Sequence, residues 1–168
     1  MSTENPTFEP KKELSETKKK LLELERSGEY VFHGSAYEGP LELQQAYNYK
    51  KGLKEKDDKP AIHASPVVDY AIMMALINKK NCSKGFHSSA RLGEKGLELK
   101  IDQKSYDQLD ENSYGWIHIF DKDKFTERSL LEYISYQSIT PTYVIKVKKE
   151  DLVDYLEIIP TPNKSKRG

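Results

Sequence analysis

The first residues in the chain whose types and spacing suit a chemical role are His33-Gly34-Ser35. Residues 29–33 have the β-favouring composition of a strand, and the glycine and serine that follow are typical of its end. A strand end fixes the direction of an imidazole. A glycine beside it lets a ligand reach backbone N–H and C=O groups without a Cβ in the way. The segment therefore indicates a ligand-binding turn, although an ordinary strand-ending turn can have the same sequence.

Two further segments place polar side chains beside predicted strands. Residues 60–64 form a short strand that contains His63 and leads through Ser65 into a helix. Residues 132–136 form a later strand that begins with Glu132. A carboxylate at the head of an otherwise apolar or aromatic strand either faces solvent or acts as a catalyst. These segments are therefore the second and third candidates for a site.

The elements expected to position these segments are helices in the first half of the chain. A leucine stripe predicts a helix over residues 11–26. Pro40 predicts the start of a short helix through residue 49. Ser65-Pro66 supply an N-cap and a first-turn proline for a helix over residues 67–78, which is apolar nearly all round and must be buried. Residues 81–96 are polar and contain glycine, so we expect a loop there.

The second half of the chain is rich in short strand signals. They cover residues 97–101, 115–120, 132–136, 142–147 and 156–159. This order predicts an α+β fold of mostly antiparallel split β-sheets, with helices concentrated in the N-terminal half. We expect a polar segment and helix over residues 1–28, one domain over residues 29–160 and a basic tail over residues 161–168.

Composition limits the classes of protein to consider. The 168 residues suit one domain, and 27 basic against 27 acidic residues give no net charge, so nothing indicates a dedicated nucleic-acid or acidic-membrane binder. Cys82 is the single cysteine, which excludes an intramolecular disulfide and a thiolate-rich zinc site. No apolar signal segment or membrane span is evident. We expect a cytoplasmic protein, with secretion by a signal-independent route left open.

Several other chemistries lack their sequence signatures. The four histidines do not have the spacing of a preorganised metal site, so we expect no metal. The chain contains no Gly-x-Ser-x-Gly elbow to hold a hydrolase nucleophile. It also contains no Walker-type loop and no Gly-x-Gly-x-x-Gly loop, which disfavours P-loop and Rossmann nucleotide sites.

Taken in order, the three segments resemble the ADP-ribosyltransferase fold, specifically the branch of diphtheria toxin and the poly(ADP-ribose) polymerases with its His-Tyr-Glu triad. In the polymerases the histidine stands in a His-Gly-Ser turn, and the glutamate stands in an Asn-Glu-Tyr-Ile/Val stretch before a further strand. Here His33-Gly34-Ser35 and the Leu-Glu-Tyr-Ile of residues 131–134 hold those places. The resemblance spans about residues 30–159.

The resemblance implies an NAD-dependent ADP-ribosyltransferase that cleaves the nicotinamide–ribose bond of its substrate NAD. Glu132 would be catalytic, because a carboxylate stabilises the oxocarbenium character that develops on the ribose. His33, the second catalytic candidate, would hydrogen-bond the other ribose, and the Gly34 backbone would bind the nicotinamide carboxamide. The candidate NAD-binding residues are His33, Gly34, Ser35, His63, Ser65 and Tyr70.

The middle position of the triad departs from the family. An ungapped alignment puts His63 where the family has the tyrosine that stacks on nicotinamide, whereas Tyr70 in the following helix could supply the aromatic face instead. The Arg-Ser-Glu branch of the fold is disfavoured because its two glutamates are separated by one residue, while Glu127 and Glu132 are five apart. The RNA 2′-phosphotransferases share the fold but depend on several arginines, of which this chain has few.

Three functions follow from the resemblance. The first is transfer of ADP-ribose to a macromolecular acceptor, with protein favoured over nucleic acid and no membrane partner. The second is a catalytically silent module that binds NAD or ADP-ribose, which the replaced tyrosine favours. The third is hydrolysis of NAD, as in an NAD-depleting toxin.

Overall fold

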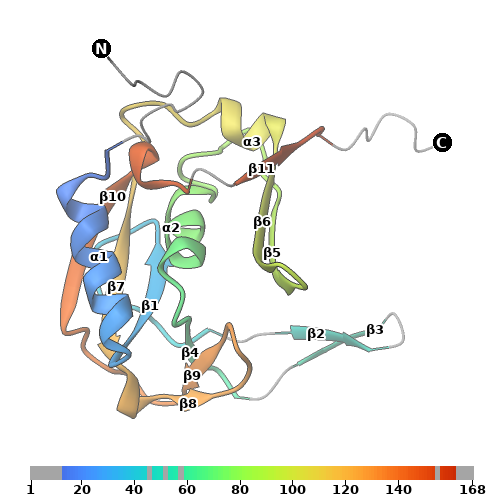
Figure 1. The fold of residues 1–168 in the computed structure, drawn as a ribbon. Helices are drawn as coiled ribbons and strands as arrows, with labels where there is room; N and C mark the ends of the chain where they lie inside the picture. The colour runs from blue at the N-terminus through green and yellow to red at the C-terminus, as the bar shows by residue number, and fades with distance from the viewer. Residues whose placement is uncertain (1–12, 45–46, 51–52, 57–58, 154–155, 162–168) are drawn as a thin grey trace.

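The fold is described by a computed structural model for residues 13–44, 47–50, 53–56, 59–153 and 156–161 (Figure 1). Its helices are α1 (Glu16–Ser27), α2 (Val68–Leu76) and α3 (Gln103–Asp107), with single 3-10 turns at Lys122–Lys124 and Lys149–Asp151. Its strands are β1 (Tyr30–Ser35), β2 (Tyr47–Lys50), β3 (Leu53–Lys56), β4 (Ile62–Ala64), β5 (Ser88–Gly93), β6 (Gly96–Asp102), β7 (Tyr114–Asp121), β8 (Thr126–Glu127), β9 (Tyr133–Ser135), β10 (Tyr143–Lys148) and β11 (Glu157–Ile159).

The described strands form small sheets. The sheet orders are β1-β7-β10, β4-β9-β8 and β11-β6-β5, and β2 pairs with β3 alone. Every pairing is antiparallel except that of β11 with β6, which is parallel. The prediction of an α+β protein with mostly antiparallel strands is therefore confirmed. The two longer helices lie in the first half of the chain, and the short α3 lies in the second.

The β1 and β4 sheets meet at a single bridge. The backbone N–H and C=O of Phe32 both pair with Ser65, which directly follows β4, at N···O distances of 2.7 and 2.8 Å. The bridge is isolated, so no ladder continues from it toward Gly34. The two sheets therefore separate at the end of β1, where the sequence predicted a ligand-binding turn.

Helix α2 packs directly on the sheet of β1 and β7 because glycines face it. A Cβ on Gly34 would lie 2.0 Å from the Ala71 carbonyl oxygen, and one on Gly115 would lie 2.0 Å from the Ala75 carbonyl oxygen. Both distances are far below van der Waals contact, so only glycine allows this close approach. The helix is buried along most of its length, as its apolar composition predicted.

Helix α1 is held against α2 by buried polar groups as well as by Leu21, which is fully buried. The Lys18 ammonium lies 2.8 Å from an Asp69 carboxylate oxygen and donates to the Asp151 backbone carbonyl at 2.7 Å. Ser15 caps the helix by accepting from the Lys18 N–H. Because the Lys18 charge is paired, its burial is compatible with a stable fold.

Three local predictions were wrong. Residues 40–49 are not helical in their described part, because Gln44 forms a bridge with Ala61 and residues 47–50 form β2. Residues 81–96 are not all loop, since residues 88–93 pair with β6 as β5. Ser65 is not the N-cap of α2; Val67 is, and the Ser65 hydroxyl accepts from the Val67 N–H.

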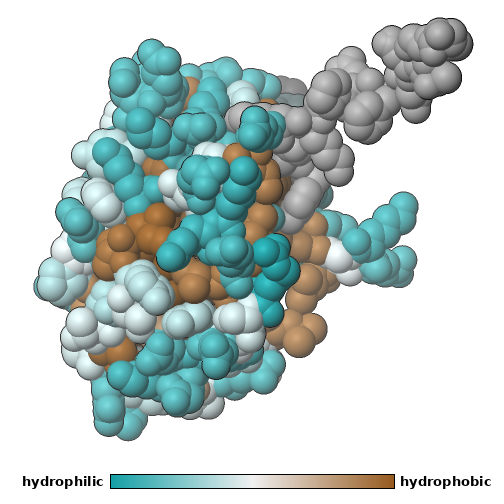
Figure 2. Space-filling model, turned by 60° about the vertical axis from the view of Figure 1, so that its left-hand side comes forward, coloured by the Kyte–Doolittle hydropathy of each residue, from teal (hydrophilic) through white to brown (hydrophobic). Residues whose placement is uncertain are grey.

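One face of the molecule is largely polar. Figure 2 shows a face covered mostly by hydrophilic residues, with hydrophobic residues gathered in a smaller central region. Within the described ranges, no helix has both the length and the apolar character needed to cross a membrane.

Candidate functional site

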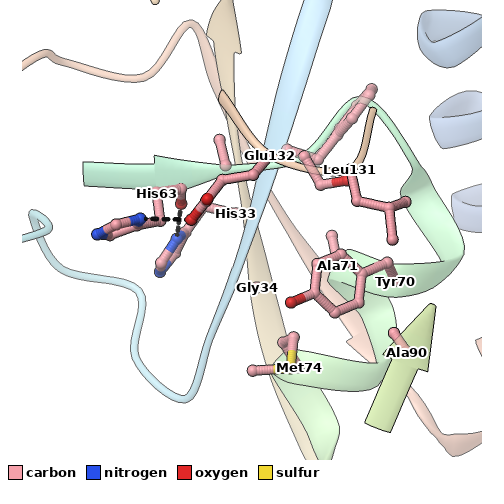
Figure 3. A pocket seen from close by; sticks show the side chains of 12 residues that line it. His33, Gly34, His63, Tyr70, Ala71, Met74, Ala90, Leu131 and Glu132 are labelled. Carbon is pink, nitrogen blue, oxygen red and sulfur yellow. Dashed lines mark hydrogen bonds and ion pairs between the residues drawn. The ribbon is translucent and has the colours of Figure 1, made fainter. Parts of the chain in front are cut away.

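A cavity of about 350 Å³ opens where β1 and β4 separate (Figure 3). Its size lies in the range of ligand-binding pockets. The strands supply one wall and α2 the other (Figure 3). The lining residues are Phe32, His33, Gly34, His63, Ala64, Ser65, Tyr70, Ala71, Met74, Ala90, Leu131 and Glu132. The three candidate segments of the sequence thus line one cavity.

Glu132 is held by a tight turn at the head of β9. Its backbone carbonyl accepts from the N–H groups of Arg128 and Ser129 at 2.9 and 3.1 Å, and its own N–H donates to the Ser129 carbonyl. The Arg128 guanidinium lies 3.7 Å from one Glu132 carboxylate oxygen. Two-fifths of the Glu132 side chain is exposed. The carboxylate is therefore fixed by its backbone, partly offset by a positive charge, and still accessible to a ligand.

His63 contacts the second oxygen of this carboxylate. The antiparallel register pairs His63 with Ile134, so Glu132 is its diagonal neighbour across β4 and β9. The His63 Nδ1 lies 2.8 Å from Glu132 Oε2, and because a carboxylate accepts, Nδ1 carries the proton. The His63 Nε2 is buried and has no hydrogen-bond partner among the described residues. Glu132 is therefore oriented by His63 as well as by Arg128.

His33 occupies the end of β1, between the two sheets. Its Nδ1 lies 2.5 Å from the His63 backbone oxygen, which can only accept, so Nδ1 donates and Nε2 keeps a free lone pair for a ligand hydroxyl. Its ring packs edge-on against His118, with ring centroids 6.3 Å apart. Burial lowers the pKa of His33 and of His118 below the usual 6.5, so both rings are neutral at pH 7.

We expect the folded state to lose stability as pH falls from 7 to 5. The unfolded chain protonates these histidines near pH 6.5, whereas the fold keeps His33 and His118 neutral to lower pH. The unfolded state then binds more protons, so acidification favours unfolding, by up to about 1.4 kcal/mol per pH unit for each histidine.

The midpoints of urea denaturation at three pH values measure this loss of stability. His33→Gln should flatten the dependence, and a curve equal to that of the unmodified protein would contradict the assignment.

Gly34 presents its backbone to the same opening. Successive residues of a strand direct their N–H and C=O groups to opposite edges, so residues two apart direct them to the same edge. Since Phe32 directs both groups toward Ser65, Gly34 directs both of its groups to that edge too, beyond the last bridge between β1 and β4. Gly34 lines the cavity. Its backbone can therefore donate to and accept from a planar amide, while its missing Cβ serves the packing of α2 rather than ligand access.

Tyr70 and Ser65 come from the helix side. Tyr70, in the first turn of α2, lies across the cavity from the two histidines (Figure 3). Burial and the nearby Glu132 carboxylate both raise the pKa of its phenol, so Tyr70 remains a neutral aromatic ring. Ser65 is buried, and its hydroxyl accepts the Val67 N–H, so it shapes the turn into α2.

A second cavity of about 320 Å³ adjoins the first. His33 and His63 line both, and Ser35 lines the second and not the first. The predicted NAD-binding and catalytic residues therefore lie in two adjoining cavities. Ser35 lines one, Glu132 lines the other, and the two histidines line both. The remaining lining residues are Tyr37, Gly39, Pro40, Leu41, Glu42, Gln44, Ala61 and Ile62.

The sequence did not identify several residues of the site. Met74 follows Tyr70 by four residues on α2, a helical spacing that could have indicated it. Arg128 precedes Glu132 by four residues but reaches it through a turn, which has no comparable pattern. Ala90 belongs to β5, in a segment predicted to be a loop. No group of three or more His, Cys, Asp or Glu side chains within the described ranges could hold a metal ion.

Comparison of the chain with protein-family models, curated proteins and solved structures found no match. The geometry of the cavity and the residues that line it are therefore the basis for a proposed function.

Proposed function

We propose that this protein is an ADP-ribosyltransferase with the fold of the His-Tyr-Glu branch, which cleaves NAD and transfers ADP-ribose to a macromolecule. One observation carries the proposal. His33, the Gly34 backbone and Glu132, about 100 residues apart in the chain, line a single cavity at a split between two sheets. A carboxylate, an imidazole and a free backbone edge are three of the groups that the resemblance requires, and in this chain they line one ligand-sized cavity.

Glu132 would act on the ribose next to nicotinamide. As the C1′–N bond breaks, its electron pair moves to the nicotinamide nitrogen, which neutralises the pyridinium, and positive charge develops on the sugar. A carboxylate fixed beside that charge lowers the barrier because it needs no reorganisation when the charge forms. The acceptor then adds a lone pair to C1′ and releases its proton.

His33, Gly34 and Tyr70 would hold the substrate. The His33 Nε2 can accept from a ribose hydroxyl, because its Nδ1 is committed to the His63 carbonyl. The Gly34 N–H and C=O match the acceptor and donor of a carboxamide. Tyr70 is a better candidate than His63 for the ring that stacks on nicotinamide. The His63 ring is hydrogen-bonded to Glu132, whereas Tyr70 lies on the opposite wall of the cavity.

The pairing of His63 with Glu132 favours a second candidate function, a silent module that binds NAD or ADP-ribose. The hydrogen bond to His63 occupies Glu132 Oε2, which would otherwise be available to a ribose hydroxyl. A carboxylate tied in this way can support binding without turnover. Release of nicotinamide by the unmodified protein distinguishes the two functions.

Binding can be tested without turnover by following thermal unfolding in the presence of NAD. A ligand that binds the folded state stabilises it by RT ln(1 + [L]/Kd), about 2.7 kcal/mol at a hundredfold excess over Kd. We expect NAD to raise the melting temperature of the unmodified chain, and His33→Ala to abolish the shift.

His87→Ala is the matched control, since His87 is exposed and lines neither cavity, and it should keep the full shift. His33→Gln serves if the alanine variant unfolds. A folded wild-type protein that millimolar NAD does not stabilise would reject the site.

A further inference from the structure

The sheet of β1, β7 and β10 has a second face, opposite α2. Gly34 and Gly115 face the helix, so their strand neighbours Ser35, Tyr114 and Trp116 face away from it. In the register of the sheet, Trp116 lies between Ser35 of β1 and Lys146 of β10. These three residues lie on the same face of the sheet as His33 and His118, whose rings contact each other.

Two lysines stack on the aromatic rings of this face. The Lys80 Nζ lies 3.5 Å from the centroid of the Tyr114 ring and 5.8 Å from that of Tyr37. The Lys146 Nζ lies 4.4 Å from the Tyr114 centroid and 6.0 Å from that of Trp116. Tyr114 and Trp116 are themselves packed edge to face, 6.4 Å apart. We name these five residues the cation–aromatic patch.

The charges of the patch are not neutralised locally. Neither lysine forms an ion pair with a carboxylate among the described residues, although acidic and basic residues are equal in number over the whole chain. Lys80 is positioned by a hydrogen bond to the Ala36 carbonyl at 3.1 Å. The patch therefore joins positive charge to aromatic rings, of which Tyr37 is exposed over 68% of its area and Tyr114 and Trp116 are half-buried.

We propose that the cation–aromatic patch binds single-stranded nucleic acid. Lysine ammonium groups bind backbone phosphates, and aromatic faces stack on unpaired bases whatever their sequence. The flexible lysine side chains can turn from the rings to the phosphates, which leaves the rings to the bases. An acidic peptide would use the charges but leave the three rings without flat partners, so nucleic acid is the better match.

The patch adjoins the candidate site. Trp116 of the patch pairs with Ser35, which lines the second cavity. Two residues farther along β7, His118 pairs with His33, which lines both cavities. Two residues of a strand span about 7 Å. A single-stranded nucleic acid bound at the patch would therefore place a nucleotide beside the cavities. If the proposed transferase function holds, on which this step rests, the acceptor is nucleic acid rather than the protein expected from net charge.

The test uses the full chain, without NAD, and a labelled oligonucleotide of roughly 12 unpaired nucleotides. Fluorescence anisotropy should show binding that weakens steeply between about 50 and about 200 mM salt, as phosphate contacts require. Trp116 is the single tryptophan, so base stacking should also quench the intrinsic fluorescence of the protein. Replacing Lys80 and Lys146 together by Gln should weaken binding by about tenfold or more and reduce the salt dependence.

The matched control replaces Lys19 and Lys20 by Gln, because both lie on α1 and the charge change is the same. Affinity in this control should stay within about twofold of wild type. Equal weakening in both double variants, binding without quenching, or a preference for an acidic peptide over the oligonucleotide would each overturn the proposal. Because no NAD is present, failure here leaves the transferase proposal standing, and failure of NAD turnover leaves nucleic-acid binding standing.

Discussion

Replacing Glu132 by Gln should lower the rate of nicotinamide release from NAD by about 100-fold or more, since one well-placed electrostatic group commonly contributes about 3 kcal/mol to a barrier. Gln keeps the shape of the side chain and much of its hydrogen bonding but removes the negative charge. NAD binding should change little, because the charge that Glu132 stabilises forms as the bond breaks. Free nicotinamide and labelled macromolecules, followed separately, measure cleavage and transfer.

Glu127→Gln is the control for this variant. Glu127 pairs with Tyr133 in the neighbouring strand but does not line the cavity, so its replacement should leave the rate of release near that of the unmodified protein. An unchanged rate in Glu132→Gln would reject the catalytic assignment. If the unmodified protein releases no nicotinamide although it binds NAD, the silent module is the correct function.

The candidate site could be predicted in outline because its residues stand at the ends of strands with local signals. His33 precedes a glycine and a serine, and Glu132 opens an apolar and aromatic strand, so both could be located without knowledge of tertiary contacts. The contact between His63 and Glu132 could not, because it depends on the pairing of β4 with β9, whose residues are about 70 apart. Register between distant strands is set by packing, which no short motif encodes.

The wrong elements have the same cause. Residues 40–49 begin with a proline, which suits a helix, yet Gln44 pairs with Ala61, and a tertiary contact of this kind overrides local propensity. Three of the six residues 88–93 are polar, and all six are half-buried or exposed, as an edge strand allows, so their composition resembles that of a loop. The local preference of a segment determines whether it forms a helix, a strand or a loop only where tertiary packing does not.

Gly34→Ala and Gly115→Ala should each destabilise the fold by about 3 kcal/mol or more. In both variants the new Cβ would fall 2.0 Å from a backbone carbonyl oxygen of α2, so the helix must move away from the sheet. Added volume in a packed core commonly costs about 1–3 kcal/mol, and here the neighbour is backbone, which cannot rotate aside. The midpoint of urea denaturation and its slope measure the loss for each variant.

Gly39→Ala is the matched control, since nothing lies within 4 Å of its added Cβ. Its stability should stay within about 0.5 kcal/mol of wild type or rise slightly, because alanine restricts the unfolded chain. A Gly34→Ala variant as stable as Gly39→Ala would show that α2 does not rest on β1. The pair of core glycines also separates two roles of Gly34. If its missing Cβ serves packing alone, Gly34→Ala and Gly115→Ala will lose similar stability, and any folded Gly34→Ala protein will still bind NAD through its backbone.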